Sequence, residues 1–194
     1  TPGNEITNSA SEPNDMLVLT KPLGSGILTA AGKANDVDQD SLNQAINIMT
    51  TLNDKAAEAM RNTKVNACTD VTGFGLIGHL TEMTEGSGLM ANIHINEIPV
   101  MKNVRNSASA GYIPKGTMQN CEAAKNTVQW ASKIKKEDKL ILCDAQTSGG
   151  LLISVSPDNL TELTENLTSN GVSEYAVIGQ MTSRTDPSLH IKVS

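Results

Sequence analysis

Residues 65–80 read V-N-A-C-T-D-V-T-G-F-G-L-I-G-H-L, and this stretch decides the fold. The apolar run that ends at Thr69 predicts a strand, and the run from about Gly73 onward predicts a helix that begins almost at once. Asp70 and Thr72 lie at the junction. A carboxylate there can hold a hard cation, and the free amides at the start of a helix favour an anion. The stretch therefore predicts a place for a metal–phosphate complex.

The composition narrows the class of protein. The chain has 194 residues, of which 38% are hydrophobic and 2% aromatic, and its formal net charge is −6. Few aromatic side chains and an acidic balance argue against a nucleic-acid partner. No apolar run approaches the ~20 residues that a membrane-spanning helix needs. Cys68, Cys121 and Cys143 show no C-x-x-C spacing, which is typical of free thiols in the cytoplasm.

Apolar runs and helical periodicities alternate along the chain and predict a mixed β-sheet covered by helices, an α/β or α+β sandwich. The Ser-Leu-Asn-Gln sequence at Ser41 fits a capping box and predicts one long helix over 41–62. Residues 114–120 and 135–139 are polar and predict a loop and a charged turn. We expect further strands over 16–20, 90–95, 128–131, 175–178 and 189–193, and further helices over 27–34, 99–110 and 157–170.

The sequence Gly73-Phe-Gly-Leu-Ile-Gly78 matches the G-x-G-x-x-G pattern of dinucleotide-binding folds. That pattern requires an acidic residue at the end of a strand about 20 residues later, where this chain has Asn92 and His94. Asp70 would also repel a pyrophosphate unless a metal ion lay between them. We therefore interpret Gly75 and Gly78 as small residues that let the helix approach the sheet.

Residues 140–156 form a second informative stretch, L-I-L-C-D-A-Q-T-S-G-G-L-L-I-S-V-S. Its hydroxyl-rich turn ends in Gly149 and Gly150, and consecutive amides of such a turn can bind an anion. An ordinary turn explains the pattern equally well. Gly24-Ser-Gly26 also has two interpretations, a strand-to-helix turn or a second set of amides facing the same site.

Five motifs are spread in order over the chain, at residues 8–13 (N-S-A-S-E-P), 18–27 (V-L-T-K-P-L-G-S-G-I), 67–80 (A-C-T-D-V-T-G-F-G-L-I-G-H-L), 116–120 (G-T-M-Q-N) and 144–152 (D-A-Q-T-S-G-G-L-L). Together they resemble the C-terminal half of selenophosphate synthetase (selenide, water dikinase). That family belongs to the superfamily of aminoimidazole ribonucleotide synthetase. Ala145 is a departure, because the family often has proline there.

The resemblance implies an enzyme that makes selenophosphate, AMP and phosphate from ATP, selenide and water, with Mg²⁺ as cofactor. It implies that residues 16–194 form the C-terminal domain, that residues 1–15 link it to an N-terminal ATP-binding domain absent from this chain, and that the full-length protein is a homodimer. Its nucleophile would lie in the absent domain, so no catalytic residue is expected here, and a fragment of this kind is expected to be monomeric and inactive.

Carried over by motif, the resemblance makes Asp70 a magnesium ligand. It places Thr69, Thr72 and Gly73 at the phosphate end of ATP, and it makes Ser148, Gly149 and Gly150 shape the cleft between the domains. Two alternatives stay open. One is the matching domain of a sister ATP-dependent enzyme, such as aminoimidazole ribonucleotide synthetase or thiamine-monophosphate kinase. The other is a non-catalytic binding domain of the same fold.

Overall fold

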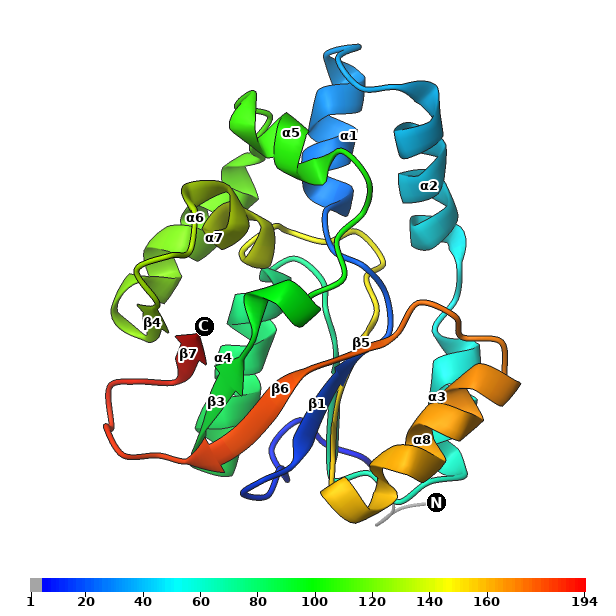
Figure 1. Ribbon diagram of the computed structural model, residues 1–194, viewed down its shortest axis with the longest axis vertical. Coiled ribbons are helices and arrows are strands. Elements are labelled where there is room, and N and C mark those ends of the chain that lie inside the picture. The colour runs from blue at the N-terminus through cyan, green and yellow to red at the C-terminus, as the bar shows by residue number, and fades with distance from the viewer. Residues whose placement is uncertain (1–4) are drawn as a thin grey trace.

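The computed structural model describes residues 5–194, which form a seven-stranded mixed sheet with the order β2-β5-β1-β6-β3-β7-β4 (Figure 1). Residues 1–4, which belong to the predicted linker 1–15, lie outside the described residues. The strands are β1 Met16–Leu19, β2 Ala67–Asp70, β3 Leu89–Ile93, β4 Val128–Trp130, β5 Leu151–Val155, β6 Ala176–Ser183 and β7 Ile191–Val193.

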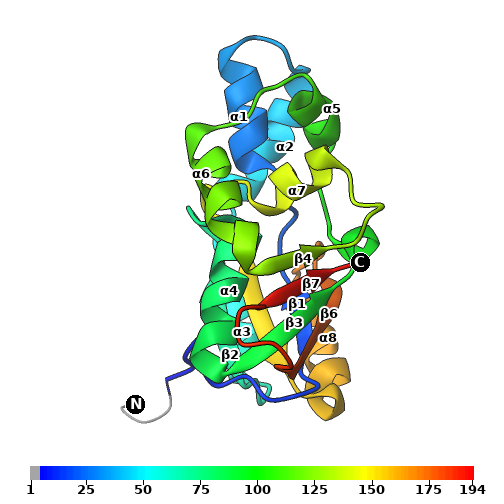
Figure 2. The ribbon, with the colours of Figure 1, turned by 90° about the vertical axis from the view of Figure 1, so that its left-hand side faces the viewer.

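Helices cover both faces of the sheet and one of its ends (Figures 1 and 2). They are α1 Ser25–Lys33, α2 Gln39–Thr50, α3 Asp54–Arg61, α4 Gly75–Ser87, α5 Val104–Ser109, α6 Lys115–Ala123, α7 Lys136–Leu142 and α8 Pro157–Ser169, with short 3-10 turns at Ile95–Glu97 and Ala124–Asn126. Helices α3 and α8 pair on one face and α4 lies on the other, while α1, α2, α5, α6 and α7 group beyond the sheet's end. The predicted sandwich of a mixed sheet and helices is confirmed.

Strand β1 lies in the middle of the sheet and pairs antiparallel with β5 and β6. Strand β2 is an edge strand that pairs antiparallel with β5, in a register that sets Asp70 opposite Leu151. At the other edge, β7 pairs parallel with both β3 and β4. The outer rim of β2 is contacted by the segment before β1, because the Cys68 amide donates to the Thr7 carbonyl at 2.9 Å.

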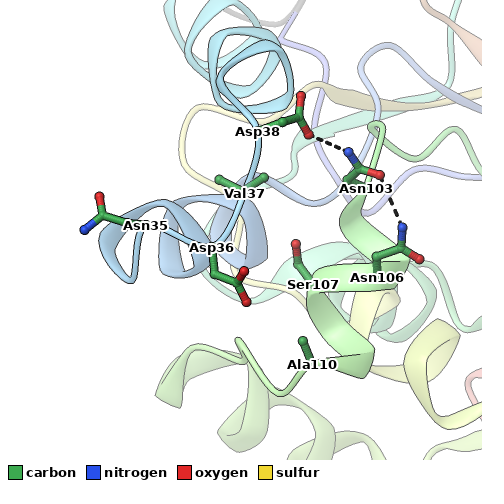
Figure 3. Close-up of a pocket in the computed structure, with 8 residues that line it drawn as sticks. All are labelled: Asn35, Asp36, Val37, Asp38, Asn103, Asn106, Ser107 and Ala110. Atoms are coloured by element: carbon green, nitrogen blue, oxygen red, sulfur yellow. Dashed lines mark hydrogen bonds between the residues drawn. The ribbon is translucent and has the colours of Figure 1, made fainter.

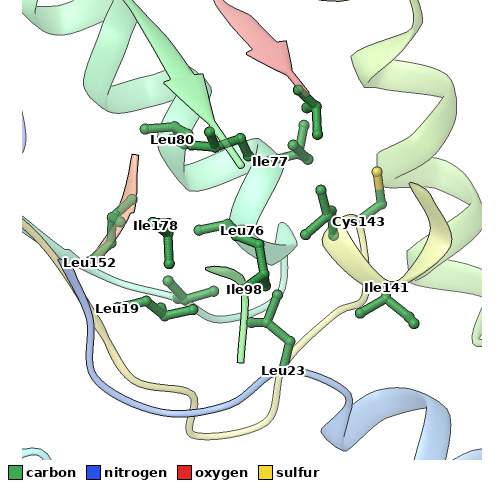
Figure 4. Packing of buried hydrophobic residues seen from close by; sticks show 14 of the residues in the cluster. Leu19, Leu23, Leu76, Ile77, Leu80, Ile98, Ile141, Cys143, Leu152 and Ile178 are labelled. Carbon is green, nitrogen blue, oxygen red and sulfur yellow. The ribbon is translucent and has the colours of Figure 1, made fainter. Parts of the chain in front are cut away.

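Two hydrophobic clusters hold the layers together, and β1 contributes to both because successive side chains of a strand point to opposite faces. Leu17 and Leu19 join the larger cluster, which α4 and the helices at the sheet's end complete (Figure 4). Val18 joins the smaller cluster with Leu163 and Leu167 of α8. Full burial of a leucine side chain stabilises a fold by about 1.5–3 kcal/mol.

The single helix predicted over 41–62 is wrong, because the chain forms α2 and α3 with a break between them. Thr51 adopts an extended conformation, and its carbonyl accepts a hydrogen bond from Lys21 Nζ at 2.6 Å. Asn53 is turned toward Gly149, whose carbonyl accepts its side-chain amide at 2.9 Å. Contacts with distant residues therefore replace local helical bonds, and Leu52, which lies in the break, is 73% exposed.

The start of α2 also differs from the prediction. Asp38 is the N-cap residue, and its carboxylate accepts the Ser41 amide at 3.0 Å and the Ser41 hydroxyl at 2.7 Å. A carboxylate accepts a helix N-terminal amide as readily as a serine hydroxyl does and adds a favourable charge. The predicted capping box at Ser41 is therefore replaced by a cap three residues earlier.

Three further segments were predicted wrongly. Residues 114–120 belong mostly to α6 and residues 135–139 open α7, whose first turn carries the favourable acidic pair Glu137 and Asp138. The helix predicted over 99–110 is confined to α5. The residues before α5 run beside Leu23 instead. The Leu23 amide donates to the Pro99 carbonyl, and the Leu23 carbonyl accepts the Met101 amide.

Candidate functional site

The junction between β2 and α4 presents the predicted metal ligand to solvent. Asp70 ends β2 and is exposed, and its carboxylate makes no hydrogen bond or ion pair with residues 5–194. Thr69 and Thr72 are half-buried beside it, and the Thr72 hydroxyl lies 3.1 Å from His79 Nε2. Gly73 is exposed, and a methyl group added to it would meet no atom within 4 Å. The junction therefore has one unpaired carboxylate and open space next to a helix start.

The negative charge of Asp70 also acts on its neighbour in β2. Burial, and secondarily the charge of Asp70, raise the pKa of the Cys68 thiol to about 12. A thiol with so high a pKa stays protonated at neutral pH and is a poor nucleophile. Cys68 is therefore suited to a structural role.

The two informative stretches of the sequence meet at this junction. The Val71 amide donates to the Gly150 carbonyl at 2.8 Å, and the Gln146 amide donates to the Thr72 carbonyl at 2.9 Å. A methyl group on Gly149 would lie 2.1 Å from the Val71 carbonyl oxygen, a distance that only glycine permits. The fold therefore places Thr69, Thr72 and Gly73 side by side with the turn at 148–150.

Within that turn, the three predicted residues differ in their surroundings. Gly149 and Gly150 are buried against backbone, and a methyl group on Gly150 would lie 2.6 Å from the Lys21 amide nitrogen. Ser148 is exposed and has a positive φ of 49°. The two glycines are explained by close packing of the chain, whereas Ser148 remains accessible to a ligand.

The start of α1 resolves the open question about Gly24-Ser-Gly26. Gln146 Oε1 accepts the amides of Gly24 and Ser25 at 3.0 and 3.2 Å. Asp144 Oδ2 accepts the next two amides, those of Gly26 and Ile27, at 3.0 and 3.2 Å. Side chains of the protein thus occupy the position where an external anion would bind. This glycine-rich turn is a structural strand-to-helix connection.

Asp144 is fully buried and is the centre of this network. In addition to the two α1 amides, its carboxylate accepts the Thr117 hydroxyl at 2.9 Å and Gln146 Nε2 at 3.0 Å. Burial raises the pKa of Asp144 to about 6, although all these donors oppose the rise. The sequence analysis assigned no role to Asp144 or Gln146. The one feature that could have indicated a role is that both are polar residues lying between two apolar runs.

Asn120 of the G-T-M-Q-N motif joins three parts of the chain. Its side-chain amide donates to the Gly73 carbonyl at 2.9 Å and to the Cys143 carbonyl at 3.0 Å. Next to this bridge, Gly75 has a φ of +68°, and a methyl group on it would lie 2.7 Å from the Cys143 carbonyl carbon. Asn120 therefore fixes the turn that follows Asp70.

The residues present fit a metal ion only if other ligands join them. No group of three or more His, Cys, Asp or Glu side chains that could hold a metal ion occurs among residues 5–194. Magnesium bound to phosphates commonly takes one or two carboxylates and completes its shell with phosphate oxygens and water. An exposed, unpaired Asp70 suits that arrangement as a single protein ligand.

Other hollows of the surface have different chemistry. One, of about 490 Å³, lies between the α1–α2 connection and α5 and contains Asp36 and Asp38 (Figure 3). Hydrogen bonds from Ser41 lower the pKa of Asp38 to about 2, so this hollow carries negative charge. Another, of about 230 Å³, begins at the exposed Phe74 and is lined mainly by apolar atoms between α4 and α6. The acidic hollow does not suit a phosphate.

No helix formed by residues 5–194 combines the length and the apolar character needed to cross a bilayer.

Comparison with known proteins gives one family match and many similar sequences. Residues 12–192 match the family model of the AIR synthase related protein, C-terminal domain. The chain is 37% identical over 188 residues to selenide, water dikinase 2 of Peptoclostridium acidaminophilum. The aligned region covers 97% of this chain and 54% of that protein. It is 40% identical over 171 residues to the selenide, water dikinase of Carboxydothermus hydrogenoformans, covering 88% and 50%. The chain thus spans about half the length of the curated relatives it matches.

Solved structures support the fold. A hydrogenase maturation protein, HypE, superposes with a TM-score of 0.73 at 13% identity, over 100% of this chain and 54% of that one. A thiamine-monophosphate kinase from Stenotrophomonas maltophilia superposes with a TM-score of 0.65 at 13% identity, over 97% and 53%. At such identities the likeness shows the shared architecture alone.

Proposed function

Because this chain belongs to the AIR synthase related protein family through that family's C-terminal domain, we propose that it is the C-terminal domain of a selenide, water dikinase. In this proposal the complete enzyme converts ATP, selenide and water into selenophosphate, AMP and phosphate. The domain closes the cleft around the phosphates of magnesium-bound ATP. The N-terminal domain supplies the nucleophile and most metal ligands, and the enzyme is a cytoplasmic homodimer.

The observation that carries the proposal is the state of Asp70. Its carboxylate is exposed and unpaired within the described residues, whereas the turn around it is fixed by bonds at Val71, Thr72 and Gly73. A free carboxylate on a rigid turn is pre-organised for a cation. The similarity to selenide, water dikinases over nearly the whole chain supports the identity of the reaction.

The proposed roles follow the positions of the residues. Asp70 would hold the magnesium ion, which neutralises charge on the transferring phosphoryl group. Thr69, Thr72 and Gly73 would line the phosphate end, and Ser148 would face the cleft. Gly149 and Gly150 would shape that cleft by letting the two turns approach, since neither has room for a side chain.

The test is selenophosphate formation by the complete protein, followed by phosphorus NMR with ATP, selenide and magnesium. Asp70→Asn removes the charge and keeps the shape, so it should lower turnover at least tenfold with little effect on stability. Asp158→Asn is the matched control, because Asp158 is also exposed but lies in the first turn of α8. Normal turnover by Asp70→Asn would refute the metal-binding role.

The same assay separates the proposal from its alternatives. A sister kinase or synthetase would consume ATP without requiring selenide and would form no selenophosphate. A non-catalytic domain would leave the ATP unchanged. Neither alternative has a structural observation in its favour, because the likeness to a thiamine-monophosphate kinase concerns the fold alone.

A further inference from the structure

Another cavity lies next to the 148–150 turn, because Lys21 and Asn53 in its lining donate to the carbonyls of Ser148 and Gly149. It has a volume of about 400 Å³ and is formed by the end of α2, the start of α3 and the loop that follows α8. Lys21, Asn53 and Lys55 are among its lining residues. Its volume falls in the ~300–1,000 Å³ range of small-molecule sites. None of the residues predicted to bind magnesium or ATP lines it.

The deepest charge in this cavity is an ammonium group without an acidic partner. Lys21 is only 6% exposed, and none of the ion pairs within residues 5–194 includes it. Its Nζ donates to the carbonyls of Thr51 at 2.6 Å and Ser148 at 3.1 Å. An ammonium has three N–H donors, so one donor remains. A buried charge normally has a partner of opposite sign, and this one has only carbonyl dipoles.

A second cation lies at another wall. A methyl group added to Gly171 would lie 3.5 Å from Lys55 Nζ, which places that ammonium at the loop after α8. Helix α3 begins in the same cavity, and its N-cap residue Asn53 makes no side-chain bond to the helix because its amide donates to Gly149. The Asp54 carboxylate instead accepts the Lys55 amide at 2.9 Å and lies at the positive end of the α3 dipole.

Two acidic residues, Asp54 and Glu174, also line the cavity, and both are exposed, as Lys55 is. Water and salt screen exposed charges strongly and buried charges much less. Lys21 is the buried member of the set, so its charge dominates the field at the bottom of the cavity. The field there favours an anion.

We propose that this cavity binds a small tetrahedral oxyanion, with Lys21 and Lys55 as its cationic ligands. Orthophosphate has oxygen acceptors on all sides and can accept from both ammonium groups at once. The same chemistry could come from free orthophosphate or from the phosphoryl end of a nucleotide. If the chain works as the proposed dikinase, which releases phosphate, the cavity is a product site behind the cleft turn. That assignment rests on the proposed function, whereas anion binding does not.

The bound anion would act on the proposed site through Lys21. The ammonium holds the Ser148 carbonyl, and Ser148 is the exposed residue of the turn that faces the proposed cleft. An anion bound through the remaining donor would draw the Lys21 ammonium toward the cavity and away from this carbonyl. Occupancy of the cavity is therefore coupled to the position of the turn.

The experiment measures orthophosphate binding to the 194-residue chain by calorimetry, at constant ionic strength set with sodium chloride and without ATP or selenide. We expect saturable binding that Lys21→Met weakens at least roughly tenfold, as the loss of a charge-assisted hydrogen bond does. Lys55→Gln should weaken it by a smaller factor. Lys33→Gln is the matched control, because Lys33 is exposed on α1 and does not line the cavity.

Competition with AMP and with magnesium-free ATP separates the two sources of the oxyanion. If a nucleotide displaces orthophosphate, the cavity binds the phosphoryl end of a nucleotide. If neither nucleotide displaces it, the cavity binds free orthophosphate. No saturable binding, or binding that neither Lys55→Gln nor a folded Lys21→Met variant weakens, would overturn the proposal. Lys55 keeps the test decisive if Lys21→Met does not fold. A negative dikinase assay would leave the binding result standing.

Discussion

Replacing the buried carboxyl of Asp144 by an amide should change how the stability of the protein depends on pH. Burial raises the pKa of Asp144 from 3.8 to about 6. The folded protein therefore holds a proton between these values that the unfolded chain releases. The contribution of this group to stability is complete below pH 3.8 and is lost as the pH rises through about 6. Asp144→Asn cannot titrate and should not show this loss.

The size of the effect follows from the two pKa values. They differ by about 2 pH units, and each unit corresponds to ~1.36 kcal/mol, which gives about 3 kcal/mol. Relative to the wild type, Asp144→Asn should thus gain about 3 kcal/mol of unfolding free energy between pH 4 and pH 7. The amide oxygen can still accept the amides of Gly26 and Ile27.

Urea unfolding at a series of pH values, followed by the fluorescence of the single tryptophan, Trp130, measures this difference. Subtracting the unfolding free energy of the variant from that of the wild type at each pH cancels the contributions of the other titrating groups. Asp144→Ala is the control and should be destabilised by several kcal/mol at every pH, because it leaves buried donors unpaired. The reasoning would be refuted if the difference in unfolding free energy between wild type and Asp144→Asn did not change with pH. It would also be refuted if the wild type became more stable relative to the variant as the pH rises. The four donors would then hold the carboxylate in its charged form.

Three other substitutions test the packing around the proposed site. Gly149→Ala should destabilise the protein by about 2 kcal/mol or more, measured by thermal unfolding, because its methyl group would overlap the carbonyl oxygen of Val71; an unchanged melting temperature would contradict this. Asn120→Ala should raise the KM for magnesium-ATP in the complete enzyme more than it lowers the melting temperature, because it frees the Gly73 carbonyl; a loss of stability with normal KM would show a purely structural role. Leu163→Ala should cost about 2–5 kcal/mol in urea unfolding, because the side chain is fully buried against the sheet; a cost below ~1 kcal/mol would mean that α8 packs loosely.

The parts of the fold that depend on local pattern were predictable. The apolar runs gave the positions of β1, β2 and β4 within one or two residues. Helix α8 begins at Pro157, and the chain turns at Gly171 with a positive φ, as the sequence signals indicate. These features depend on residues that are neighbours in the chain.

The parts that depend on distant residues were not predictable. The break between α2 and α3 is stabilised by Lys21 and by the carbonyl of Gly149, which lie far from it in the sequence. Asp144 and Gln146 cap a helix that begins more than a hundred residues earlier. A single sequence does not indicate which polar side chain meets which helix end, because that pairing is set by tertiary packing.

For the candidate site, the motif alone located Asp70 on an exposed junction. It did not distinguish glycines that line a ligand from glycines that permit close packing. Gly149 and Gly150 belong to the second kind by their surroundings, and that distinction needed the backbone of Val71 and Lys21 beside them.

The strand order also governs how the protein is made. Met16 of the central strand pairs with Val155 on one side and with Gln180 on the other. During synthesis the ribosome delivers β1 more than a hundred residues before β5 and β6, its two neighbours in the sheet. The nascent domain must therefore keep an apolar strand unpaired over that interval, which makes chaperone engagement an advantage until β6 is released.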